Sequence, residues 1–206
     1  MVTAALAALL LAAPGAPPLS TRAAAPITPS LHLSIGTGYC DRASVPGTDI
    51  RSPNQPCYLV FGALASLRHR MLEAGVSYEG RQPLDLLSLF SFRPPTATVV
   101  GGSVGVTGRV GERWRLSAAG EVGWRRYTHF AGHGPSTWRG DADTVYAGLV
   151  GRAATGLKNP GGRTDRIEVT LAWRDDLRSA TDQVAGQAWR VGGWSITMGV
   201  GLVADW

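Results

Sequence analysis

Hydrophobic and polar residues alternate along the last segment of the chain, residues 194–206. Trp194, Met198 and Leu202 fall on one face of an extended strand, and small or polar residues such as Thr197 and Gly199 fall on the other. Successive side chains of a β-strand point to opposite sides. The segment therefore predicts a strand with one apolar face and one small, polar face.

The same alternation recurs along the rest of the chain. The strands are predicted at about 30–40, 58–68, 71–80, 96–109, 113–128, 144–157, 166–174 and 194–206. Short connections follow the second, fourth and sixth segments, and the long connections cover about 41–57, 81–95, 129–143 and 175–192. Short turns at one rim and long loops at the other are typical of transmembrane barrels. The pattern predicts an all-β fold, an eight-stranded antiparallel up-and-down transmembrane β-barrel.

Tryptophan spacing gives a second indication of a membrane. Trp114 and Trp124 lie ten residues apart on one face of a predicted strand. At ~3.3 Å per residue and a tilt near 40°, this separation is roughly 25 Å, the height of the apolar band of a membrane barrel. Aromatic rings favour the two membrane–water interfaces. We expect interface positions for Trp114, Trp124, Trp173, Trp194 and Trp206.

The N-terminal region and the composition fit an exported protein. Residues 1–25 contain a short apolar run at 4–13, and they predict a signal peptide preceding a barrel domain at 26–206. The mean hydropathy is +0.01, which is expected where apolar and polar positions alternate. The net charge of +5 comes from scattered arginines, and no nucleic-acid-binding motif is present. Nucleic acid is therefore not an expected partner.

The export signal, the eight alternating segments, the loop asymmetry and the final Gly-Val-Gly-Leu-Val-Ala-Asp-Trp at 199–206 together resemble a known class. The chain is similar to the small eight-stranded outer-membrane barrels, the OmpA transmembrane-domain and OmpX-like proteins. The resemblance implies a bacterial outer-membrane location. It also implies that Trp206 acts as the assembly signal read by the barrel assembly machinery, although most members of the class end in Phe.

Charged residues on the polar faces predict a network inside the barrel. Eight strands enclose an interior that side chains nearly fill, and buried charges need partners. We expect a salt-bridge network that closes the lumen, and the alternative is a gated polar plug or a narrow ion path. The residues expected in this lumen are Glu73, Arg109, Arg115, Glu121, Arg152 and Glu168.

The chain has two cysteines, Cys40 and Cys57, which flank the first long loop. In an oxidising compartment they predict a disulfide that closes this loop. No accompanying histidine or cysteine pair indicates a metal site, and no cofactor is expected. Several arginines near the outer rim predict contact with outer-membrane lipid and lipopolysaccharide phosphates. They are Arg125, Arg126, Arg139, Arg174, Arg178 and Arg190.

These observations predict a non-enzymatic monomer with a structural or adhesive role. Its long loops would contact an extracellular partner that the sequence does not identify. A narrow, porin-like pore is one alternative. A lipid-modifying enzyme is a second, with His129, His133, Ser136 and Asp141 as the candidate catalytic residues. A third is a soluble, lipocalin-like ligand-binding barrel with its aromatic residues inside.

Overall fold

The computed structural model describes residues 26–40, 44–49, 57–83, 97–128, 140–156, 166–184 and 186–206. The predicted signal peptide at 1–25 lies outside this part of the chain. The described residues include no helix with the length and apolar character needed to span a bilayer.

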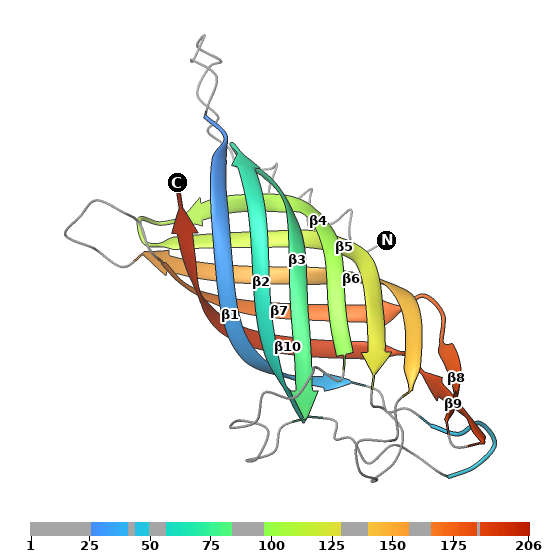
Figure 1. The fold of residues 1–206 in the computed structure, drawn as a ribbon. Helices are drawn as coiled ribbons and strands as arrows, with labels where there is room; N and C mark the ends of the chain where they lie inside the picture. The colour runs from blue at the N-terminus through green and yellow to red at the C-terminus, as the bar shows by residue number, and fades with distance from the viewer. Residues whose placement is uncertain are drawn as a thin grey trace.

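Eight strands form a closed antiparallel barrel (Figure 1). Around the barrel their order is β1-β10-β7-β6-β5-β4-β3-β2, so the last barrel strand pairs with the first. The predicted all-β fold with eight barrel strands is confirmed. The barrel strands are β1 (Thr28–Cys40), β2 (Cys57–His69), β3 (Leu72–Pro83), β4 (Ala97–Val110), β5 (Trp114–Thr128), β6 (Asp141–Gly156), β7 (Arg166–Asp176) and β10 (Trp194–Asp205).

The two ends of the barrel differ in their connections. Strands β1, β3, β5 and β7 finish at one end, here called the loop end, where the long connections start. The other end, here called the turn end, carries the tight turns from β2 to β3 and from β4 to β5. Arg70 and Gly111 take positive φ angles of 55° and 63° in these turns. The chain's C-terminus also lies at the turn end (Figure 1).

The fourth long connection contains a hairpin that the sequence analysis treated as loop. Strands β8 (Ala180–Val184) and β9 (Gln187–Val191) pair with each other and lie at the loop end (Figure 1). Trp189, Val184 and Val191 form a small buried core with Ala142 of β6. Each hairpin strand has only five residues. This is too short for alternation to stand out in a sequence, but packing against the barrel end stabilises it.

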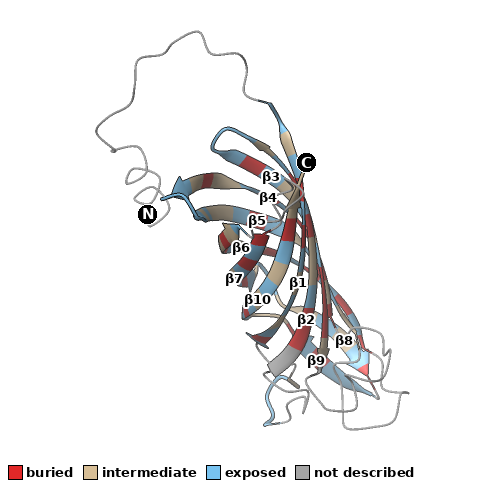
Figure 2. Cartoon of the chain, turned by 90° about the vertical axis from the view of Figure 1, so that its left-hand side faces the viewer, coloured by how far each residue is buried: buried red, intermediate tan, exposed pale blue. Residues whose placement is uncertain are grey.

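The barrel wall is apolar outside and polar inside, as the alternation predicted. Large apolar side chains point outward, and Met198 and Leu202 are 54% and 60% exposed. Inward positions are buried and often charged, and Glu121 is only 3% exposed. Figure 2 shows buried and exposed positions alternating along individual strands.

Tyr146 packs across two inward-facing glycines. The register places Tyr146 of β6 beside Gly123 of β5, which pairs in turn with Gly101 of β4. A Cβ added at Gly123 would lie 2.2 Å from the carbonyl oxygen of Val100 and 2.8 Å from Cε1 of Tyr146. Glycine at this position therefore allows the buried tyrosine to lie close to the wall.

We predict that Gly123→Ala destabilises the barrel, because the added methyl group clashes with backbone that cannot easily move. The expected loss is about 1–3 kcal/mol in the free energy of unfolding, measured by denaturant titration in detergent micelles. Gly120→Ala on the same strand is the matched control, since its Cβ would meet no atom within 4 Å. Equal effects of the two substitutions would contradict this account of the wall.

Candidate functional site in the barrel lumen

The inward charged side chains gather in two groups, one toward each end of the barrel. The loop-end layer comprises Glu79, Arg81, Glu121, Arg125, Arg174 and Asp176. The turn-end layer comprises His32, Arg68, Glu73, Arg115, Arg152, Arg166, Glu168 and Asp205. Strand alternation directs these side chains into the lumen, and the stagger of the strands decides which of them meet.

In the loop-end layer, Arg174 joins carboxylates from two other strands. Its Nη1 lies 2.9 Å from Oε2 of Glu79, and its Nε lies 2.7 Å from Oε2 of Glu121. Glu79 also accepts a 2.6 Å hydrogen bond from Nε of Arg81. The three strands β3, β5 and β7 are thus connected across the interior by charge-assisted hydrogen bonds.

A second part of the loop-end layer surrounds Arg125. Its Nη1 lies 2.9 Å from Oδ1 of Asp176, and both side chains are fully buried. Tyr127 donates a 2.7 Å hydrogen bond to Asp176, and Arg125 donates one of 3.0 Å to Ser195. The Tyr146 ring lies 5.3 Å from the guanidinium carbon of Arg125. Three arginines and three carboxylates balance in this layer, so its buried charges are paired.

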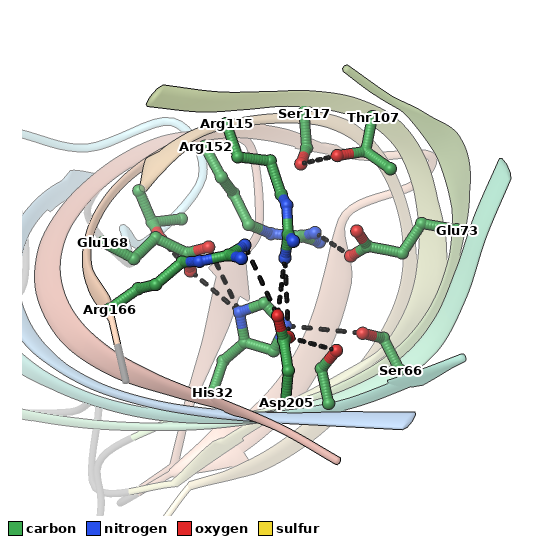
Figure 3. A network of polar contacts seen from close by, with 12 residues as sticks. His32, Ser66, Glu73, Thr107, Arg115, Ser117, Arg152, Arg166, Glu168 and Asp205 are labelled. Atoms are coloured by element: carbon green, nitrogen blue, oxygen red, sulfur yellow. Dashed lines mark hydrogen bonds and ion pairs between the residues drawn. The ribbon is translucent and has the colours of Figure 1, made fainter. Parts of the chain in front are cut away.

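The turn-end layer also contains an ion pair between Arg152 and Glu73 and a hydrogen bond between His32 and Glu168 (Figure 3). Nη1 of Arg152 lies 2.6 Å from Oε1 of Glu73. Nδ1 of His32 lies 3.0 Å from Oε1 of Glu168, and its Nε2 lies 3.3 Å from Oγ of Ser66. These contacts bring β1, β2, β3, β6 and β7 together.

Asp205, near the end of β10, is the turn-end carboxylate that contacts three arginines. It accepts hydrogen bonds from Nη1 of Arg115 at 3.0 Å and from Ser30 at 2.9 Å. Arg166 and Arg68 approach it more distantly, at 3.4 and 3.6 Å. One acidic group therefore lies among three guanidinium groups.

A cavity of about 60 Å³ lies between the two layers. Its lining includes Glu121 and Arg174 from the loop-end layer and His32, Arg152 and Glu168 from the turn-end layer. This volume is enough for a few water molecules. The cavity is thus lined by polar side chains from both charged layers.

The residues expected in the lumen mostly lie there but rarely pair with one another. Of the six, Glu73 and Arg152 form a pair, while Arg115, Glu121 and Glu168 bind partners that the sequence analysis did not select. Arg109 differs from the expectation, because it is exposed near the end of β4. Strand β4 reaches the barrel rim there, so its last inward position opens to solvent.

Two arginines assigned to the outer rim lie inside the barrel instead. Arg125 and Arg174 are buried, because β5 and β7 carry them into the lumen. They are therefore not available to lipopolysaccharide. Arg126, Arg178 and Arg190 are exposed as expected, and Arg139 lies outside the described residues.

The candidate catalytic set in the third loop is only partly described. His129, His133 and Ser136 lie outside the described residues. Asp141 belongs to β6 rather than to a loop, and its carboxylate pairs with the Arg126 guanidinium. It therefore acts as an exposed ion-pair partner at the rim.

Several lumen residues were missed although the alternation could have found them. His32 and Glu79 already fall on the polar faces of predicted strands, and Asp205 falls on the polar face of the last one. Arg81 and Asp176 lacked this signal, because β3 and β7 extend beyond their predicted ends.

The five tryptophans expected at the interfaces all have exposed side chains. Trp124, Trp173 and Trp194 lie toward the loop end, and Trp114 and Trp206 lie toward the turn end. Trp194 stacks on Tyr39 with ring centroids 5.4 Å apart. The outer wall thus carries aromatic residues toward both of its ends.

The register places the two cysteines next to each other along the ladder, since Cys57 pairs with Tyr39. Their side chains lie outside the described part of the structure, so the disulfide stays a prediction. Among the described residues, no group of three or more histidine, cysteine or acidic side chains is arranged to hold a metal ion.

Comparison with solved structures identifies the fold. Neisserial surface protein A has a TM-score of 0.55 and 9% sequence identity, over 90% of this chain and 100% of that chain. The N-terminal β-barrel domain of Pseudomonas aeruginosa OprF has a TM-score of 0.49 and 10% identity, over 87% and 97% of the two chains. At these identities the likeness concerns the fold. No protein-family model and no curated protein matches the chain.

We predict that Arg125→Met strongly destabilises the barrel, because it leaves the fully buried Asp176 without its ion-pair partner. The expected loss is about 3–5 kcal/mol in the free energy of unfolding, measured by denaturant titration in detergent. The neighbouring Arg126→Met is the control, since its pair with Asp141 is exposed and should contribute far less. Similar losses for both variants would refute the assigned role of the buried pair.

Proposed function

We propose that the chain is an integral barrel protein of a bacterial outer membrane. The supporting observation is the orientation of the wall, with large apolar side chains outside and paired charges inside. Such a wall buries its apolar surface only in lipid, and barrel closure leaves no unpaired strand edge in the hydrocarbon. A soluble lipocalin-like barrel would have the opposite arrangement around its ligand.

Other features agree with this location. The tryptophans near both ends of the wall match the aromatic girdles of membrane barrels. Residues 1–25 have the pattern of an export signal. The fold also resembles that of a neisserial surface protein, which agrees with a location at the cell envelope. In this arrangement the turn end faces the periplasm and the loop end faces the exterior.

We predict that Met198→Arg impairs insertion into lipid vesicles. Met198 lies in the middle of β10 on the outer face, where an arginine would enter hydrocarbon. Near the bilayer midplane this costs about 2–4 kcal/mol, and the folded fraction is measured by heat-modifiable gel migration. Leu177→Arg is the control, because Leu177 is exposed just beyond the end of β7. Normal insertion of Met198→Arg would contradict the membrane location.

We propose further that the lumen is sealed and that the protein acts as a scaffold for its loop end. Two layers of paired charges lie on either side of a cavity of about 60 Å³, and this arrangement supports a closed lumen. The exposed surface at the loop end includes the β8–β9 hairpin. This arrangement favours a structural or adhesive monomer that contacts lipopolysaccharide and an extracellular partner there.

The sealed lumen predicts that the refolded protein produces no stable channels in a planar bilayer. The reason is that ions would have to displace buried, hydrogen-bonded ion pairs. Single-channel recording measures this directly, and a general porin in the same bilayer serves as the control for detection. Reproducible current steps that scale with salt concentration would favour the narrow-pore alternative instead.

An enzymatic role has one structural argument in its favour. Ser66, His32 and Glu168 follow the order of nucleophile, base and orienting carboxylate. All three are buried in the lumen, and the nearby cavity has no room for an acyl substrate. We therefore propose that this group is structural.

We propose in addition that Cys40 and Cys57 form a disulfide and that the barrel assembly machinery recognises Trp206.

A further inference from the structure

Positive charge exceeds negative charge at the turn end of the lumen. Within the described residues, Arg152 forms an ion pair with Glu73, and His32 forms a hydrogen bond with Glu168. Asp205 is then left as the shared partner of Arg68, Arg115 and Arg166. The loop-end layer, in contrast, balances three arginines with three carboxylates.

A further arginine increases this excess. Arg109 of β4 pairs in register with Arg115 of β5, so two cations lie directly opposite each other. Both Arg109 and Arg68 repel the charge of Arg115. Like charges at opposed positions are destabilising unless an anion lies between them. Arg109 is exposed, whereas the side chains of Arg68, Arg115 and Arg166 are 14%, 11% and 9% exposed, so the group extends from the surface into the lumen.

The hydrogen bonds at Asp205 leave donors available. Arg115 and Ser30 donate to its carboxylate. Nη1 of Arg166 is buried, and although it lies 3.4 Å from the carboxylate it makes no hydrogen bond. Figure 3 shows Arg115 and Arg166 reaching from different strands toward the centre of the lumen. A buried guanidinium donor without a hydrogen bond is unfavourable, and an added acceptor would remove this cost.

We propose that the turn-end mouth is a binding site for a phosphate group, formed by Arg68, Arg109, Arg115 and Arg166. The planar guanidinium group matches the oxygens of phosphate and binds them in a bidentate manner. Asp205 contacts Arg68, Arg115 and Arg166, and it competes with the ligand for these three. The inference rests on the proposed function in one respect, since a membrane barrel presents this mouth to free phosphate and to phospholipid headgroups of the periplasmic leaflet.

The test begins with the full chain folded in neutral detergent, titrated with inorganic phosphate at low ionic strength by calorimetry. Saturable binding is expected, and the Arg109→Gln/Arg166→Gln double variant should weaken it by about tenfold or more through loss of two charge-assisted contacts. Asp205→Asn should tighten binding several-fold, because the competing carboxylate is removed. Arg70→Gln removes an exposed arginine of the β2–β3 turn that lies outside this group, and it should leave the affinity unchanged.

A second arm distinguishes a lipid headgroup from free phosphate. The same variants are incubated with mixed phosphatidylglycerol and phosphatidylcholine micelles, and native mass spectrometry measures which lipid is retained. Preferential retention of phosphatidylglycerol that the double variant loses identifies a headgroup as the phosphate source. Binding of inorganic phosphate without lipid retention identifies the free ion.

Absence of both phosphate binding and lipid preference in folded wild-type protein would overturn the proposal. Weaker phosphate binding by folded Asp205→Asn, or equal weakening by Arg70→Gln, would overturn it as well. Heat-modifiable migration shows that each variant is folded. Failure of wild-type protein to insert into vesicles would contradict the membrane location while leaving the detergent titration valid, so the two proposals fail separately.

Discussion

The structure depends on closure of the barrel through the pairing of β1 with β10. This ladder runs from Ser30 opposite Asp205 to Cys40 opposite Ser195, and it leaves neither strand with an open edge. In a lipid environment an unpaired edge would expose backbone groups that water cannot satisfy. The closing ladder also includes a side-chain contact, because Ser30 donates a hydrogen bond across it to Asp205. The Asp205 carboxylate therefore belongs both to the closing ladder and to the turn-end layer.

The interior reflects the small size of an eight-stranded barrel. Glycines let strands and the Tyr146 ring approach closely, and long arginine side chains cross the remaining space to reach carboxylates on other strands. Around Arg174, arginines and carboxylates are equal in number and connect in ion pairs. Around Asp205, arginines outnumber carboxylates, so the turn-end mouth can bind a further anion. The same wall thus gives the two ends of the barrel different chemical properties.

The alternation of residues was enough to predict the eight barrel strands and which side chains face inward. It did not predict which charges pair, because that depends on register and stagger between strands distant in sequence. Glu121 and Arg174 meet although they are 53 residues apart. Small errors in strand ends also mattered, because Arg81 and Asp176 lie beyond the predicted ends of their strands. Arg125 and Arg174 were assigned to the outer rim, but the strands carry them into the lumen. The β8–β9 hairpin was missed because its strands have five residues each, and its apolar residues are buried by contacts with segments distant in sequence, including Val45 and Ala142.

That hairpin has a practical consequence for the insertion of foreign peptides into the chain. Trp189 and its apolar neighbours fix its base to the barrel end, and Ser44 adds a backbone bridge to Arg190. Gly186 adopts a positive φ of 77° in the turn between the hairpin strands. It is exposed, as are Gln187 and Ala188 that follow it. A peptide epitope inserted at this turn would project away from the bonded lumen, with both of its ends anchored by an ordered pair of strands.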